Sequence, residues 1–292
     1  MVAPVVKRVP ERDCYLDTKS LEKLKDFVLQ KIGFALSKNK ITELKTFTSE
    51  LMALSSCENF DQFHALLYSS SPEADLVLNR LTSFLTTGET YFFRVQSHFR
   101  IIKEVLIPEI VKRHRNDRTI RIWSAGCSTG EEPYSLAIML AESLPELADW
   151  EISILATDIN REALNKTQEG LYGRWSFREV PMDVIKRNFT HKGDKYLIKK
   201  KFKDMVTFKY LNLVEDGYPS LATNTAEIDL ILCRNVSIYF SPEVITRVVS
   251  KLYKSLVEGG YLLVGPAECS ADVYRNFVTR VFPDVIVYQK RE

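Results

Sequence analysis

Apolar residues near the start of the chain recur at the spacing of an amphipathic helix. The first such set comprises Leu21, Leu24, Phe27, Val28 and Ile32. Similar spacing over residues 41–54 and 60–68 predicts two more helices. Ser71 before Pro72 predicts the capped start of another helix, since proline suits a first helical turn. We therefore predict a small all-helical domain over residues 15–85.

Beyond about residue 119 the pattern changes to short apolar runs that alternate with helical segments. The runs predict strands over residues 119–125, 151–159, 206–213, 228–233, 261–266 and 281–289. Helical segments cover residues 133–144, 160–170 and 242–257. Because strands that alternate with helices form a parallel, doubly wound sheet, we predict an α/β domain over residues 86–292.

Residues 171–205 interrupt this alternation. They contain Trp175 and Phe177 but no long apolar run. Within 171–204 there are ten Lys or Arg and four Asp or Glu, a net charge of +6. We predict an inserted basic β-subdomain, with a small hairpin over residues 193–202. An acidic partner would complement this charge, although a solvated hairpin face explains it equally well.

Composition narrows the class of protein. The formal net charge of +2 and the hydrophobic fraction of 45% indicate an ordinary globular protein without a nucleic-acid partner. The cysteines form no CxxC pair, so we expect neither a metal site nor a disulfide framework. The N-terminus lacks the apolar stretch of a secretory signal, and no window approaches the roughly 18–20 apolar residues of a membrane span. We expect a cytoplasmic monomer that does not insert into membranes.

The stretch SAGCSTGEEPYS, residues 124–135, follows the first predicted strand and has the composition of a ligand-binding turn. Gly126 and Gly130 lack a Cβ atom, which would let a ligand approach the backbone. Asp158 ends the second predicted strand, where Rossmann-like proteins bind ribose hydroxyls. The sequence thus predicts a nucleoside site at the carboxyl ends of these strands.

The charge of the turn indicates which nucleoside binds. Glu131 and Glu132 would repel the pyrophosphate of a dinucleotide, whereas S-adenosylmethionine (SAM) carries an ammonium, a sulfonium and no phosphate. The alternative is a plain strand–turn–helix whose acids complement the helix dipole. Downstream, Arg234, Asn235 and Tyr239 follow a buried strand and would face the same crevice, unless they are a capping Asn and a core Tyr.

Several blocks together resemble the CheR-type chemotaxis receptor methyltransferases. They are TTGETYFFRVQSHF (86–99), RIWSAGCSTGEEPYSLA (121–137), ATDINREAL (156–164), VTFKYLNL (206–213), LILCRNVSIYF (230–240) and GGYLLVGPAE (259–268). The resemblance implies a helical N-terminal domain and a Rossmann-like class I methyltransferase sheet with an inserted small β-subdomain. It also implies SAM-dependent methylation of receptor glutamates, giving γ-methyl esters and S-adenosylhomocysteine.

Matched motifs assign the site residues that this resemblance implies. The cofactor would contact Gly88, Thr90, Arg94, Gly126, Glu131, Asp158, Asn212, Leu213, Arg234 and Asn235. Arg94 and Tyr239 would lie nearest the transferred methyl group. The inserted subdomain would be where some members dock a receptor C-terminal peptide. Two features depart from the family: Gly88 replaces a usual Asn, and residues 38–54 have few basic residues where an arginine-rich helix is usual.

The expected reaction needs little acid–base chemistry. A glutamate, with an ordinary pKa of about 4.3, is already ionised at pH 7, so alignment with the S–CH₃ bond suffices. Arg94 would hold the carboxylate and Tyr239 would orient it, and we expect no catalytic role for the four histidines. Two alternatives remain: a methyltransferase with an amine or RNA acceptor, which would need a base, and a non-catalytic regulatory module.

Overall fold

The computed structural model describes residues 16–86, 88–143 and 149–291. The chain divides into two compact units, and the boundary falls between Phe84 and Leu85. Three parts of the sequence-based predictions concern residues outside the described ranges: the N-terminal residues 1–15, Thr87, and residue 144 at the end of a predicted helix. No helix in the described ranges is long and apolar enough to cross a membrane.

The first unit consists of helices. They are α1 (Thr18–Lys31), α2 (Lys38–Leu54), α3 (Phe60–Leu67) and α4 (Pro72–Leu85). The side chains of Asp17, Ser37 and Asn59 accept hydrogen bonds from first-turn N–H groups and cap the first three helices. Leu24 and Phe27 are fully buried, as the helical spacing predicts. The predicted helical character of this segment is confirmed.

The second unit is built on a seven-stranded sheet of order β6-β2-β1-β7-β8-β10-β9. The strands are β1 (Thr119–Ala125), β2 (Glu151–Asp158), β6 (Val206–Tyr210), β7 (Ile228–Cys233), β8 (Leu256–Val264), β9 (Val278–Phe282) and β10 (Val285–Gln289). The first five of these run parallel, while β10 is antiparallel to β8 and β9. This sheet confirms the predicted Rossmann-like class I methyltransferase fold.

The prediction of a single final strand over residues 281–289 is wrong. The chain reverses after Phe282 and returns as β10, so these residues form part of a hairpin. Pro283 lacks an N–H group, and Asp284 adopts a left-handed φ of 62°. Both residues favour a turn over a continuous strand.

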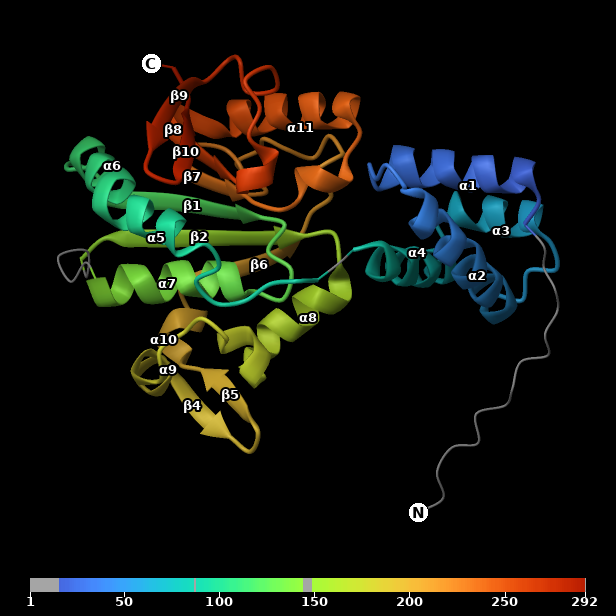
Figure 1. The fold of residues 1–292 in the computed structure, drawn as a ribbon, viewed down its shortest axis with the longest axis horizontal. Helices are drawn as coiled ribbons and strands as arrows, with labels where there is room; N and C mark the ends of the chain where they lie inside the picture. Colours follow the sequence, from blue (N-terminus) through green and yellow to red (C-terminus); the bar gives the residue numbers. More distant parts are fainter. Residues whose placement is uncertain (1–15, 87, 144–148, 292) are drawn as a thin grey trace. The chain divides into compact units, whose positions relative to one another are not determined.

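Helices pack along the sheet (Figure 1). They are α5 (Gln96–Ile101), the π-helix η1 (Ile102–Leu106), α6 (Ile107–Arg113), α7 (Glu131–Ser143), α8 (Arg161–Glu169) and α11 (Pro242–Ser255). Asn160 caps the start of α8 and Gly170 ends it with a φ of 65°, as the predicted segment 160–170 requires. These helices supply the apolar side chains that cover the strands.

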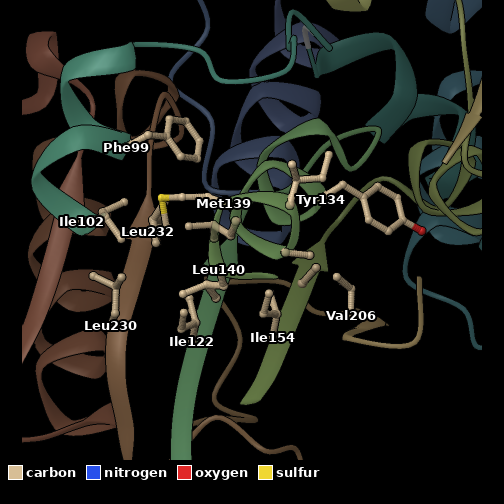
Figure 2. Close-up of a cluster of buried hydrophobic side chains, with 14 of the residues drawn as sticks. Phe99, Ile102, Ile122, Tyr134, Met139, Leu140, Ile154, Val206, Leu230 and Leu232 are labelled. Carbon is tan, nitrogen blue, oxygen red and sulfur yellow. The ribbon is translucent and has the colours of Figure 1, made fainter. Parts of the chain in front are cut away.

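The main core lies between the strands and the α5–α7 segment (Figure 2). Ile122, Leu230 and Leu232 contribute alternate positions of β1 and β7, and Met139 and Leu140 of α7 meet them from the helix side. The period of two follows from strand geometry, because successive side chains point to opposite faces. This core fixes α7, and therefore the turn before it, against the carboxyl ends of the strands.

Residues 171–205 form a separate three-stranded sheet of order β3-β5-β4 with short helices. Its elements are β3 (Leu171–Tyr172), η3 (Arg174–Phe177), α9 (Met182–Asn188), β4 (Phe189–Lys192), β5 (Lys195–Ile198) and α10 (Lys200–Lys203). The hairpin is displaced from the predicted residues 193–202. Gly193 sits in its turn with a φ of 64°, and the lysine-rich residues after Ile198 are helical. Backbone geometry favours glycine in a hairpin turn, where φ is positive, over glycine at the start of a strand, where the hairpin prediction had placed Gly193.

Candidate functional site

The carboxyl ends of three parallel strands meet at one edge of the sheet. β1 ends at Ala125, β2 at Asp158 and β7 at Cys233. The strand order changes direction between β1 and β7, since β2 and β6 lie on one side and β8 on the other. Open α/β sheets bind ligands at such a point. The loops after β1 and β7 therefore form the candidate site.

The loop after β1 is fixed against the end of β2. The N–H groups of Gly126 and Cys127 both donate to the carbonyl oxygen of Thr157, at 2.8 and 2.9 Å. Gly130 N–H then donates to the Cys127 carbonyl at 3.0 Å and closes the turn. These backbone hydrogen bonds hold the loop against the end of β2.

Asp158, the residue expected to bind ribose, links the β1 and β2 loops. Its Oδ2 accepts the Ser128 N–H at 2.7 Å, and its Oδ1 accepts the Asn160 N–H at 2.8 Å. Burial raises the pKa of Asp158, while these backbone hydrogen bonds lower it. Each carboxylate oxygen has a second lone pair, so the group can still accept hydrogen bonds from ribose hydroxyls.

The two glycines of the turn serve protein packing. A Cβ atom on Gly126 would stand 2.3 Å from Val236 Cγ2, and one on Gly130 would stand 2.9 Å from Thr167 Cγ2. Their φ values of 86° and 91° also favour glycine. Neighbouring side chains therefore fill the Cβ direction of both glycines, which is a packing reason for glycine at each position, and the predicted approach of a ligand to their backbone stays a prediction.

The two acids of the turn differ in their surroundings. Glu131 is buried and accepts hydrogen bonds from the hydroxyls of Thr129 at 2.7 Å and Ser176 at 2.9 Å. Burial raises the pKa of Glu131. Glu132 instead pairs with Arg234 Nη1 at 2.9 Å and accepts the Ser124 hydroxyl at 2.7 Å. Only Glu131 therefore offers negative charge to a cationic ligand, because a guanidinium already neutralises Glu132.

Arg234 is a buried connector between loops. Besides Glu132, its guanidinium donates from Nη2 to the carbonyl oxygen of Arg94 at 2.5 Å. The Arg234 side chain is only 2% exposed. The loop after β7 is thereby tied both to the start of α7 and to the segment that carries Arg94.

The segment from Gly88 to Arg94 extends along the same edge. A Cβ on Gly88 would lie 3.5 Å from Ser128 Oγ, which places this residue beside the β1 turn. Arg94 is partly exposed and precedes α5, and its Nη1 donates to the Glu89 carbonyl at 2.6 Å. Thr90, partly buried, lies between them. These three expected cofactor residues thus lie on one non-helical segment, which turns at residues 92–95 before α5 begins.

The loop after β7 carries the other expected residues. Asn235 adopts a left-handed φ of 58°. Tyr239 ends the short 3₁₀ turn η4 (Ser237–Tyr239) and is partly buried. Its N–H donates to the Val236 carbonyl at 3.2 Å, which tightens the turn.

Asn212 and Leu213 follow β6 and are both buried. Asn212 Oδ1 accepts the Val214 N–H at 3.1 Å, and the Tyr218 hydroxyl donates to the Leu213 carbonyl at 2.8 Å. The residue paired with Asp158 in β6 is Tyr210, two positions earlier. Both expected cofactor residues therefore follow the strand next to Asp158, the acid that we expect to bind ribose.

His98 is buried within α5, near the site. Burial, and then the positive charge of Arg234, lower the pKa of His98 to about 3. Such a ring is neutral at physiological pH and is a weak base. The sequence-based expectation gave His98 no catalytic role, and this environment agrees with that expectation.

Three residues that help to build the site were not foreseen. The Tyr172 hydroxyl donates to the Thr129 carbonyl at 2.9 Å, and Ser176 binds Glu131, so the inserted subdomain contacts the β1 turn directly. Glu268, after β8, binds the loop after β7. The block 259–268 was matched as a motif, but no pattern within it identifies the partners of its last residue.

The arrangement fits SAM. Glu131 would supply a buried carboxylate for the ammonium or sulfonium, Asp158 would supply acceptors for the ribose, and Leu213 would supply an apolar surface. The sequence model of one family, described as "CheR methyltransferase, SAM binding domain", matches residues 88–280. The chain belongs to the CheR methyltransferase family.

Related proteins agree with this assignment to the CheR family. A chemotaxis protein methyltransferase of Borreliella burgdorferi is 34% identical over 85% of this chain and 87% of that protein. Chemotaxis protein methyltransferase 2 of Vibrio cholerae is 30% identical over 92% and 91%. Chemotaxis protein methyltransferase 1 of Pseudomonas aeruginosa is 36% identical over 63% and 67%. This CheR-family protein is a SAM-dependent methyltransferase of chemotaxis, which confirms the predicted cofactor and enzyme class.

Proposed function

We propose that this CheR methyltransferase esterifies glutamate side chains of a chemoreceptor-like signalling protein. SAM supplies an electrophilic methyl group next to a positively charged sulfur. A glutamate carboxylate attacks that carbon from the side opposite the sulfur, and the C–S bond breaks as the ester C–O bond forms. No proton moves, so the protein has to provide position and charge only.

The observation that carries this proposal is that the residues expected nearest the transferred methyl group, Arg94 and Tyr239, and the adjoining Arg234 and Asn235 include no general base. Glu132 is paired with Arg234, and Glu131 already accepts two hydroxyl hydrogen bonds. His98 has a pKa of about 3 because burial disfavours its charged form. An amine acceptor would have to lose a proton, whereas a carboxylate would not. The site therefore favours a carboxylate over an amine.

Within this proposal Arg94 holds the acceptor carboxylate. Its guanidinium is partly exposed, donates from Nη1 to the Glu89 carbonyl and lies 5.8 Å from the centroid of the Tyr91 ring, which leaves N–H donors for a bidentate contact. The Arg234 side chain, buried on the other side, fixes the Arg94 backbone. Tyr239 would orient the same carboxylate through its hydroxyl.

The proposed partner is an acidic segment of a chemoreceptor-like protein. The names of the relatives place them in chemotaxis. The inserted subdomain has a net charge of +6 over residues 171–204 and an exposed Trp175, which would suit an acidic receptor segment or a C-terminal peptide. Residues of α2, by contrast, include three lysines and no arginine. The inserted subdomain is therefore the better candidate for acceptor contact.

The test is transfer of labelled methyl from SAM into membranes of the source cell, followed by mild base. Esters release volatile methanol, whereas N-methyl groups stay bound. We expect volatile label with the wild type and a loss of at least tenfold with Arg94→Ala. Arg100→Ala, on the exposed side of α5, is the control and should keep the activity. Label that stays bound after mild base would contradict glutamate as the acceptor and would indicate an amine or RNA acceptor.

A further inference from the structure

The Glu268 carboxylate makes several hydrogen bonds with the loop after β7, and no pattern in the sequence predicts these contacts. It ends the short 3₁₀ turn η5 (Pro266–Glu268) that follows β8, and its side chain is buried. Because β8 is the neighbour of β7, this turn lies beside the loop that carries Arg234 and Asn235.

The carboxylate of Glu268 accepts five hydrogen bonds. Oε2 accepts the N–H groups of Gly265 and Asn235, both at 2.6 Å. Oε1 accepts the N–H of Val236 at 2.8 Å, and both the N–H and the hydroxyl of Ser237 at 2.7 and 2.9 Å. Three consecutive backbone N–H groups, 235 to 237, therefore point at one anion.

Such a concave run of N–H groups is an anion-binding nest, and its ligand here is part of the protein. The nest requires the left-handed φ of 58° at Asn235, a conformation that is sparsely populated for residues other than glycine. Asparagine adopts this conformation more readily than most residues, and hydrogen bonds to a charged acceptor are stronger than neutral ones, so the carboxylate adds to the stability of this loop shape.

This loop shape matters for the site in two ways. Val236 lies against Gly126 of the β1 turn, and the Val236 carbonyl accepts the N–H of Tyr239. Arg234, which precedes the nest, fixes the Arg94 carbonyl. A change at Glu268 would therefore affect both the β1 turn at Gly126 and the segment that carries Arg94.

We propose that Glu268 is a positioning residue for SAM binding and methyl transfer, acting through the backbone of residues 235–237. The inference rests on the methyltransferase activity and not on the identity of the acceptor. Its test is the affinity for SAM measured by titration calorimetry, a readout that does not depend on the acceptor and so is separate from the glutamate assignment.

Glu268→Gln keeps the shape of the side chain but replaces one acceptor oxygen by an NH₂ group that faces N–H donors. We expect SAM to bind at least tenfold more weakly, and Glu268→Asp, which keeps the charge, to recover part of the loss. Glu109→Gln is the matched control. Glu109 binds Arg280 at 2.6 Å, away from the loop after β7, so this change should lower the melting temperature but leave SAM affinity within twofold.

Gly265→Ala provides a second, independent test that leaves Glu268 in place. The φ of Gly265 is −65°, which alanine adopts readily, but its Cβ would stand 2.6 Å from Glu268 Oε2. The new methyl group should displace the carboxylate and weaken SAM binding several-fold in a folded protein. If Gly265→Ala and folded Glu268→Gln both bind SAM within twofold of the wild type, Glu268 is only a stabilising residue and the proposal is wrong.

Discussion

At the scale of single residues, one buried ion pair determines how the site is assembled. The Glu132 and Arg234 side chains are 14% and 2% exposed, and they join α7 to the loop after β7. Burial raises the pKa of Glu132, and the charge of Arg234 opposes this effect. Breaking such a pair leaves one charge buried without its partner, which usually costs more than the pair itself contributes.

We expect Glu132→Gln to lower the free energy of unfolding by about 3–5 kcal/mol, because Arg234 loses its counter-charge. Chemical denaturation measures this loss. The double variant Glu132→Gln/Arg234→Met should be more stable than the single variant, since no charge remains buried. Equal stability of the wild type and Glu132→Gln would show that solvent already screens Arg234.

Gly88 stands where the resemblance to the CheR family implies a usual Asn, and we expect it to lie near the cofactor. Its built Cβ makes only an ordinary contact of 3.5 Å with Ser128 Oγ, and its φ is not in the left-handed region. Asparagine should therefore fit without strain beside the β1 turn.

We expect Gly88→Asn to tighten SAM binding by about fivefold, the effect of one net hydrogen bond of roughly 1 kcal/mol. Titration calorimetry measures the change. Gly193→Asn, in the open hairpin turn of the inserted subdomain, is the control and should not alter the affinity. Unchanged or weaker binding by Gly88→Asn would mean that the amide does not reach the cofactor.

At the scale of elements, the end of the sheet opposite the site holds a titratable cluster. His114, after α6, contacts Asp229 of β7 through Nε2 at 2.7 Å and Asp117 through Nδ1 at 2.9 Å. Burial alone would lower the pKa of His114, but the hydrogen bonds and charges of Asp117 and Asp229 outweigh it, so the pKa is raised above 6.5.

A histidine whose pKa is higher in the folded protein stabilises the fold while it is protonated in that state. This contribution should be complete below about pH 6.5, the ordinary value, and should disappear as the pH rises through the higher folded pKa. Unfolding free energies of the wild type and His114→Gln, measured from pH 5 to 9, should converge at the alkaline end. A difference that does not change with pH would contradict the ionic origin of this contact.

Prediction from sequence succeeded for elements whose signal is local. The strands β1 and β7 were predicted to the residue because each is an apolar run between polar segments. The β9–β10 hairpin was missed because its signal, Pro283 followed by Asp284, is only two residues long. The contacts of Glu268 could not be predicted, because they join backbone N–H groups about thirty positions away, and such pairing depends on the neighbouring strands.

At the scale of the whole molecule, the two ends of the parallel strands of the second unit carry different groups of functional and stabilising residues. The carboxyl ends carry the candidate SAM site, and the opposite end carries the His114–Asp229 cluster, which we expect to affect stability and not methyl transfer. The inserted subdomain adds a third element, because Tyr172 and Ser176 contact the β1 turn. A partner on the inserted subdomain would therefore lie close to the cofactor site.

The most direct test of the central claim is mass-spectrometric location of the transferred methyl group on the acceptor protein after reaction with SAM. The proposed chemistry predicts the mass of one methyl group on a glutamate side chain, removed by mild base and absent with Arg94→Ala. A methyl group on a lysine, an arginine or an RNA base, stable to the same treatment, would contradict it.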